Sequence, residues 1–150
     1  MTTRLGPEHL RCARFVRTAL LAALGISPAA VGGTLTVTMT DVPSATGELM
    51  ISIGDEAAFN GTAPYAVRAI LPARVGTVTF STDALPDGSY AARIMQDLNG
   101  NGELDSNFVG MPKEPWGMSN NARGNFGPPT FEDARFELTG DTTLAIQVRK

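Results

Sequence analysis

The chain has 150 residues, of which 43% are hydrophobic, and its 12 basic and 15 acidic residues give a formal net charge of −3. This length suits one domain, and the acidic balance argues against a nucleic acid or an anionic membrane surface as the partner. The single cysteine and the single histidine, Cys12 and His9, both lie near the start of the chain. We therefore expect no disulfide framework, no His or Cys metal site and no Ser-His or Cys-His catalytic pair in the rest of it.

Residues 1–32 are predicted to form a signal peptide. A basic region is followed by an apolar run at 18–26 and then by small residues at 27–33, the order that export signals share. The apolar run is too short for a membrane-spanning helix, which needs about 20 residues. We expect cleavage before Gly33, with cleavage after Ala30 as the second choice. The mature protein would then be periplasmic or associated with the cell envelope, without an integral membrane segment.

Cleavage would leave residues 33–150 as a single β-sandwich domain. It removes four basic residues and one acidic residue, so eight basic residues remain against fourteen acidic ones, a net charge of −6. It also removes Cys12 and His9. The 118 residues that remain are enough to bury a core of ordinary size.

Short segments with the two-residue period of half-buried strands follow one another through this domain. Seven such segments are predicted, at residues 34–40, 48–53, 65–71, 76–81, 90–95, 134–138 and 142–148. Their spacing of about ten residues, without long helical patterns between them, predicts an all-β fold: a single antiparallel two-sheet sandwich. Residues 54–60 are expected to hold one short helical turn.

Residues 106–130 interrupt this pattern with a long stretch that is rich in Pro, Gly and Asn. Long loops without regular structure are usually disordered or functional, and this one contains too many large apolar side chains for a disordered linker. We expect an ordered surface loop that carries a ligand surface formed by Met111, Trp116, Met118 and Phe126. The alternative for Trp116 is burial under the loop as a small core of its own.

Residues 97–105 have the spacing of a calcium loop. Asp97, Asn99, Asn101 and Asp105 would be ligands 1, 3, 5 and 9, with Gly102 at the sharp bend, the Glu103 carbonyl at position 7 and Leu104 anchoring the loop to the core. Position 12 is Phe108 and not a bidentate Glu, so a helix-loop-helix calcium site is not expected. Glu114 is the nearest candidate for the missing ligand. With so few formal charges, we expect weak binding, with a dissociation constant of roughly 10⁻⁴ to 10⁻³ M.

The same residues also suit a turn without a metal ion. Asn-Gly occurs twice at 99–102, and this dipeptide is a strong hairpin-turn signal because both residues tolerate positive φ. In that alternative, the Asp and Asn side chains bond to the loop's own backbone. We favour the cation because a simple turn does not need acidic residues at both ends.

Three blocks of sequence resemble one exported bacterial family, domain of unknown function 2141. They are residues 90–105, 110–121 and 128–134, and the resemblance covers essentially the whole mature chain. The approach Leu-Pro-Asp-Gly-Ser-Tyr at 85–90 is similar, more generally, to prealbumin-like and collagen-adhesin B-type sandwich modules. The resemblance implies the fold and an exported location, and it implies no activity.

Three functions remain open on the sequence. The first is a non-enzymatic envelope protein, stabilised by calcium, whose long loop binds a protein partner, a peptide, a glycan or a small ligand. The second is a hydrolase acting on a glycan through carboxylates alone, which would need Glu114 and either Glu132 or Asp133 on opposite sides of a shared cleft. The third is a structural or assembly module that pairs through its edge strands.

Overall fold

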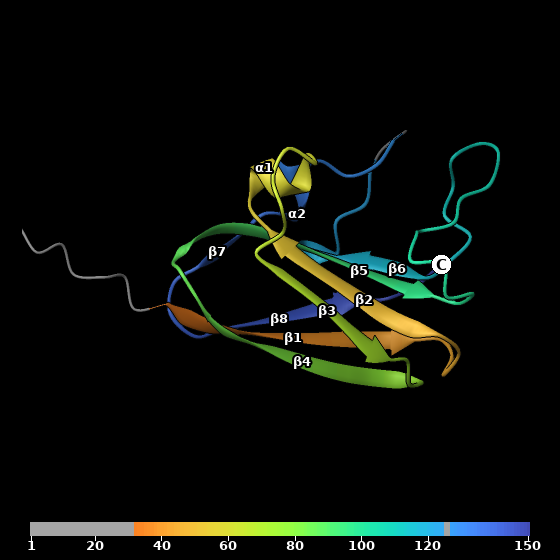
Figure 1. Cartoon of the computed structure of the whole chain (residues 1–150), viewed down its shortest axis with the longest axis horizontal. Coiled ribbons are helices and arrows are strands. Elements are labelled where there is room, and N and C mark those ends of the chain that lie inside the picture. Colours follow the sequence, from red (N-terminus) through yellow and green to blue (C-terminus); the bar gives the residue numbers. More distant parts are fainter. Residues whose placement is uncertain (1–31, 125–126) are drawn as a thin grey trace, which may run out of the picture.

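The structure is a computed structural model that describes residues 32–124 and 127–150 (Figure 1). The predicted signal peptide, apart from Gly32, and Phe126 therefore lie outside the described residues. The elements are β1 (Gly33–Val42), β2 (Glu48–Gly54), α1 (Glu56–Phe59), β3 (Val67–Pro72), β4 (Gly76–Leu85), β5 (Gly88–Asp97), β6 (Trp116–Met118), η1 (Ser119–Asn121), α2 (Phe131–Ala134), β7 (Phe136–Leu138) and β8 (Thr142–Gln147).

Two sheets face each other, which confirms the predicted sandwich. One sheet has three strands in the order β4-β1-β8, and the other has the order β3-β2-β5-β6, with β7 also pairing with β5. Figure 1 shows β1, β4 and β8 below, and the two short helices α1 and α2 above the second sheet. The helical turn predicted at 54–60 is confirmed as α1.

The core forms between the sheets because the strands alternate inward apolar and outward polar residues. In β1, the side chains of Leu35, Val37 and Met39 are fully buried, while the threonines between them are half-buried on the other face. Leu49, Ile51 and Ile53 of β2 close the core from the five-stranded sheet. Full burial of one such side chain contributes about 1.5–3 kcal/mol.

One strand pairing departs from the antiparallel prediction. β1 pairs with β4 in antiparallel fashion but with β8 in parallel, with Leu35 opposite Thr142 and Thr40 opposite Gln147. Parallel neighbours need a long connection, and here β4 and the whole five-stranded sheet lie between them in the sequence. Local periodicity identifies a strand but says nothing about its direction relative to a partner so distant in the chain.

The stretch at 106–130 is more regular than expected. It contains β6 and the 3₁₀ turn η1, and α2 follows at once. The strand predicted at 134–138 begins only at Phe136, because Ala134 ends α2. Thr130 and Asp133 form a capping box that starts this helix, a signal that competes with the strand pattern. The strand predicted at 65–71 begins at Val67.

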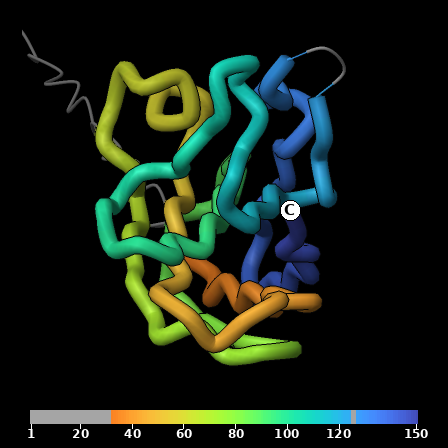
Figure 2. Tube along the Cα trace, turned by 90° about the vertical axis from the view of Figure 1, so that its right-hand side faces the viewer, coloured from red at the N-terminus to blue at the C-terminus, as the bar shows by residue number. Residues whose placement is uncertain are grey.

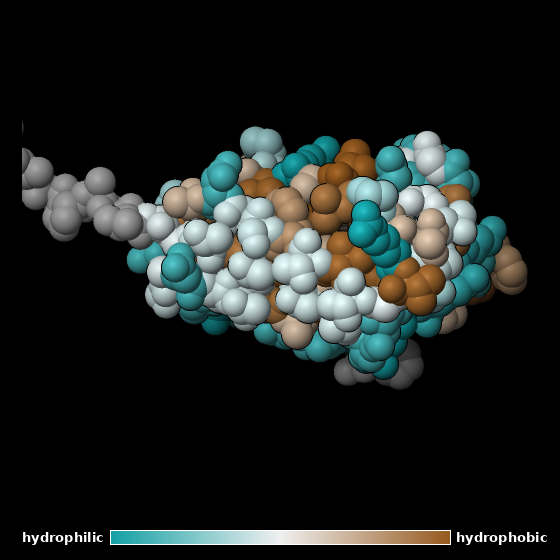
Figure 3. Space-filling view, turned by 90° about the horizontal axis from the view of Figure 1, so that it is seen from below, coloured by the Kyte–Doolittle hydropathy of each residue, from teal (hydrophilic) through white to brown (hydrophobic). Residues whose placement is uncertain are grey.

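The outer face of the three-stranded sheet is covered largely by hydroxyl side chains. Thr36 of β1 lies between Ser81 of β4 and Thr143 of β8, and Thr38 lies beside Thr79. This face is mostly pale in Figure 3, between the hydrophilic and hydrophobic colours. Within the described ranges, no helix is long and apolar enough to cross a bilayer.

Candidate ligand groove and adjoining loop

The outer face of the five-stranded sheet carries a second, smaller apolar cluster. α1, η1 and α2 cover one end of this face, and Phe59 meets Phe131 there edge to face, with 5.7 Å between ring centroids. We call these three elements the helical cap. Asp55 begins α1 by accepting a hydrogen bond from the backbone N–H of Ala58, which satisfies one of the free amides at a helix start.

Strand register arranges the outward side chains of this sheet in two neighbouring rows. The first, which we call the polar row, runs across β3, β2 and β5 as Arg68, Ser52 and Arg93, and it ends at the apolar Met118 of β6. The apolar row runs beside it as Ile70, Met50, Met95 and Trp116. Neighbouring strands lie about 4.8 Å apart and alternate residues point to the same face. A basic strip and an apolar strip therefore lie side by side on the sheet.

A groove with a cavity volume of about 350 Å³ lies over these two rows. Besides Ser52, Arg93 and the three methionines at 50, 95 and 118, it is lined by Tyr65, Leu104 and Pro128. The segment after α1, the loop after β5 and the segment after η1 all rise on the same side of the sheet (Figures 1 and 2). The groove therefore has a floor of strands and walls of loops, and its concave, mostly apolar lining is of the kind that small-molecule sites have.

Arg93 forms the charged end of the groove. Its Nη1 donates to the Tyr65 hydroxyl at 2.9 Å and its Nη2 to the Phe59 carbonyl at 3.0 Å, and its guanidinium carbon lies 3.7 Å from the centroid of the Phe59 ring. Its Nε is buried without a hydrogen-bond partner among the described residues. Contacts with a π face and a carbonyl hold the guanidinium in place while leaving donors free.

Three arginines on or beside this face lack an ion-pair partner. In the part of the chain that the structure describes, both ion pairs involve Arg135, so Arg68, Arg93 and Arg123 have no carboxylate partner there. Arg123 stacks on Trp116, with its guanidinium carbon 4.2 Å from the ring centroid. Burial, and then the charge of Arg149, lower the pKa of Arg123, although an arginine stays protonated near neutral pH.

The loop at 97–105 is held by its own side chains. Asp97 is 2% exposed and accepts hydrogen bonds from the backbone N–H groups of Gly100 and Gly102, both at 2.7 Å. These bonds, that of Gly102 first, lower the pKa of the Asp97 carboxyl. The Nδ2 atoms of Asn99 and Asn101 both donate to Asp105. The bonding of Asp and Asn side chains to the loop's own backbone that we kept as the alternative is thus present.

The donor chemistry of this loop suits calcium, but its arrangement does so only in part. Asp97, Asn99, Asn101 and Asp105 supply the hard oxygens that calcium prefers. The two amides, however, turn their nitrogens toward Asp105, and each would have to rotate to present its oxygen. Among the described residues, no three His, Cys, Asp or Glu side chains are grouped so that they could hold a metal ion.

Glu114 joins the two ends of this loop. It is 3% exposed, and its Oε1 accepts from the backbone N–H of Leu98 at 2.8 Å while its Oε2 accepts from that of Asp105 at 3.1 Å. Glu103 is exposed at the loop surface. Leu104 does not anchor the loop in the core as expected: it is 37% exposed and lines the groove instead.

The connection between β5 and β6 continues into a turn at residues 107–111, the loop tip, which presents apolar side chains to solvent. Phe108 is fully exposed and Met111 is 64% exposed. Asn107 holds the tip, because its Oδ1 accepts from the backbone N–H groups of Val109 and Met111. The exposed side chains therefore sit on a hydrogen-bonded turn.

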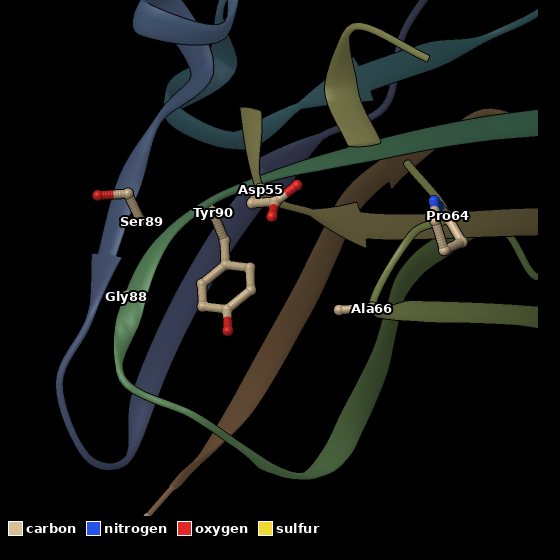
Figure 4. Close-up of a pocket in the computed structure, with 6 residues that line it drawn as sticks. All are labelled: Asp55, Pro64, Ala66, Gly88, Ser89 and Tyr90. Carbon is tan, nitrogen blue, oxygen red and sulfur yellow. The ribbon is translucent and has the colours of Figure 1, made fainter. Parts of the chain in front are cut away.

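A second hollow, of about 330 Å³, lies at the other end of the sheet and is lined by Asp55, Pro64, Ala66, Gly88, Ser89 and Tyr90 (Figure 4). The Tyr90 hydroxyl points away from Asp55 in this view and donates to the Pro86 carbonyl at 3.0 Å. Burial first, and then the charges of Asp55 and Asp87, raise the pKa of Tyr90. The side chains of Asp55, Ser89 and Tyr90, which line this hollow, each already form a hydrogen bond within the protein.

The structure brings together only part of the predicted ligand surface. Trp116 and Met118 lie on β6 and share the outer face, where Met118 lines the groove and Trp116 is half-buried beneath Arg123. Met111 lies at the loop tip and does not line the groove. Sequence reasoning missed Met50, Ser52 and Arg93, whose outward positions in β2 and β5 could have been found by alternation.

The three carboxylates considered for hydrolysis do not line either hollow. Glu114 binds two backbone amides, Asp133 caps α2 by accepting from Thr130, and Glu132 pairs with Arg135 at 3.3 Å. Each is thus engaged in a local structural contact.

Fold and groove together define a small two-sheet β-sandwich domain with a ligand-sized hollow on one sheet. The chain belongs to the family described as "Uncharacterized protein conserved in bacteria (DUF2141)", whose model matches residues 37–146. That range begins in β1 and ends in β8, so it spans both sheets, and it confirms the resemblance seen in the sequence motifs. Comparisons with curated proteins and with solved structures gave no match.

Proposed function

We propose that the protein is an exported, non-enzymatic binding domain that holds a small ligand in the groove between the helical cap and the loop after β5. The observation that carries this proposal is the groove itself, about 350 Å³ in volume and lined by three methionines. A volume of this size is in the range of small-molecule sites. Flexible methionine side chains adapt to apolar ligands of differing shape.

A non-enzymatic role is favoured by the contacts of the carboxylates. Glu114, Glu132 and Asp133 are bound to backbone amides, an arginine and a helix start. Hydrolysis by carboxylates alone, the enzymatic alternative considered for this sequence, needs two carboxylates that face the substrate across a cleft. Support for export comes from the basic, apolar and small-residue order of residues 1–32.

Calcium has a stabilising role in this proposal. A cation bound by Asp97, Asp105 and the rotated amides of Asn99 and Asn101 would fix the 97–105 loop, and Leu104 in that loop lines the groove. The support is the type and spacing of the oxygen donors.

A neutral apolar dye, N-phenyl-1-naphthylamine, tests the groove. Ser52 lies on its floor between Arg68 and Arg93, so Ser52→Phe should fill it and remove the rise in dye fluorescence seen with the wild type. Ser81→Phe is the matched control, because Ser81 is an exposed outward residue of the opposite sheet. Equal dye binding by all three proteins would show that the groove is not the binding site.

A further inference from the structure

We propose that the groove takes a small amphipathic carboxylate, with its anionic end against Arg93 and its apolar chain along Met50 and Met95. This inference rests on the proposed function of the groove and adds the chemical class of the ligand. It follows from the two rows of side chains described above, which differ in character although they lie only two residues apart along each strand.

The charge of the polar row selects an anion. Ser52 lies in register between Arg68 and Arg93, and neither arginine has a carboxylate partner within the described ranges. The groove lining contains no acidic residue, although the chain has 15. A permanent guanidinium charge with free N–H donors is best satisfied by an oxyanion, which the arginine fork binds through parallel hydrogen bonds.

The apolar row selects the rest of the ligand. Met50 and Met95 are directly opposite each other, two residues along their strands from Ser52 and Arg93 and therefore on the same face. Leu104 and Met118 complete the apolar lining. An unbranched chain lying here would be in contact with three of the six methionines of the protein, whose unbranched side chains adapt to its shape.

A carboxylate fits better than a multiply charged group. Arg93 already uses two of its donors on Tyr65 and Phe59, which leaves enough for one planar oxyanion. The net charge is −3 for the whole chain and −6 for residues 33–150, and it opposes the approach of a dianion more than that of a monoanion. The most direct contact is thus between one guanidinium and one carboxylate.

Sodium octanoate and 1-octanol test the inference on the unmodified protein, because they share a chain and differ in the charged end. Calorimetric titration of the full chain should show octanoate binding about tenfold more tightly or better, the value of one hydrogen-bonded charge contact. Backbone amide NMR signals of β2, β5 and β6 should shift with octanoate.

Variants then locate the charge. Arg93→Gln should lower octanoate affinity about tenfold and leave octanol unchanged, and Arg93→Lys should fall between the two. Arg74→Gln removes the same charge from an exposed turn outside the groove and should bind octanoate like the wild type. If Arg93→Gln does not fold, the wild-type ligand pair and Arg93→Lys still decide the question.

The outcomes separate this inference from the proposed function. Octanol binding as tightly as octanoate, or Arg74→Gln weakening octanoate as much as Arg93→Gln, would overturn the carboxylate assignment. If octanoate gives neither heat nor shifts while the neutral dye still binds and Ser52→Phe removes it, the groove remains a binding site for another class of ligand. Loss of both signals would reject the two proposals together.

Discussion

Glu114 shows how one side chain can order a long loop. Its carboxylate is almost fully buried, yet its two oxygens are satisfied by the amides of Leu98 and Asp105, which lie at opposite ends of the 97–105 loop. Hydrogen bonds to an ionised acceptor are worth more than neutral ones, about 1.5–3 kcal/mol each. The residue was expected to be a metal ligand, and its observed contacts give it a structural role even without an ion.

Glu114→Gln should therefore destabilise the fold. The glutamine keeps one acceptor, but its NH₂ group faces an N–H where the carboxylate had an oxygen, so we expect a loss of about 1.5–3 kcal/mol in urea unfolding. The loop should also become sensitive to protease. Glu103→Gln is the control, because Glu103 is exposed in the same loop and should change the free energy of unfolding by less than about 0.5 kcal/mol. Equal stability of the two variants would contradict the proposed role of Glu114 in joining the two ends of the loop.

Asp97 gives the fold a dependence on acid. Hydrogen bonds from the loop amides hold its folded-state pKa below the usual value, so its stabilising effect is present above about pH 3.9 and is lost as the pH falls through the lower, folded-state pKa. We expect the urea midpoint to decrease as the pH is lowered below about 4. Asp133 contributes with the same sign, because hydrogen bonds from Thr130 lower its pKa too.

Asp97→Asn should make the urea midpoint less dependent on pH. The dependence should not vanish, because Asp133 still titrates in this variant. The measurement is the urea midpoint between pH 6 and pH 2, for the wild type and the variant in parallel. An identical acid slope in both proteins would show that Asp97 does not contribute to it.

At the scale of elements, the predicted calcium binding of the loop after β5 can be tested by thermal unfolding. Calcium should raise the melting temperature of the wild type, since a ligand present at 100 times its dissociation constant adds about 2.7 kcal/mol. Asp105→Ala removes a donor oxygen from the exposed side of the loop and should abolish the rise. Magnesium, which demands a stricter octahedral geometry, serves as the control ion. A melting curve unaffected by calcium at about 100 mM, which is 100 times the weakest dissociation constant expected, would leave the loop as a turn closed by its own side chains.

Strands that alternate strictly could be predicted from the sequence, and those without a period could not. The alternation of Leu35, Val37 and Met39 with threonines is enough to predict β1 from the sequence. β6, by contrast, is three residues long, and its central Gly117 is needed because a Cβ there would lie 2.5 Å from the Gln147 carbonyl oxygen. That requirement comes from β8, which is distant in the sequence. Gly117 follows Pro112 and Pro115 closely in the sequence, and a segment with this composition is predicted to be a loop.

The candidate groove was hidden from sequence reasoning for a similar reason. The outward face of β2 and β5 was predictable residue by residue, but a groove exists only once register places Ser52 beside Arg93 and Met50 beside Met95. The loop motifs at 97–105 drew attention because they are continuous in the sequence. Leu104 is the point at which the two regions meet.

At the scale of the molecule, the domain should be independent of residues 1–32. Every named strand and helix lies within residues 33–147, so a chain that begins at Gly33 should melt like the full-length protein. In cells, N-terminal sequencing of the protein from the periplasmic fraction should find a start near Gly33, and that protein should contain no thiol. An intact Met1 on protein confined to the cytoplasm would contradict export.

The parallel pairing of β1 with β8 also affects when the fold can form. Thr36 lies opposite Thr143, so the first strand acquires this neighbour only after almost the whole domain has been synthesised. Contacts between residues so distant in the chain slow folding, because the loop must close before the contacts stabilise it. Until β8 has been made, β1 has β4 as a neighbour on one side only, so the sandwich stays incomplete for longer. For a chain exported as proposed above, this delay favours passage through a narrow channel, which only an unfolded chain can thread.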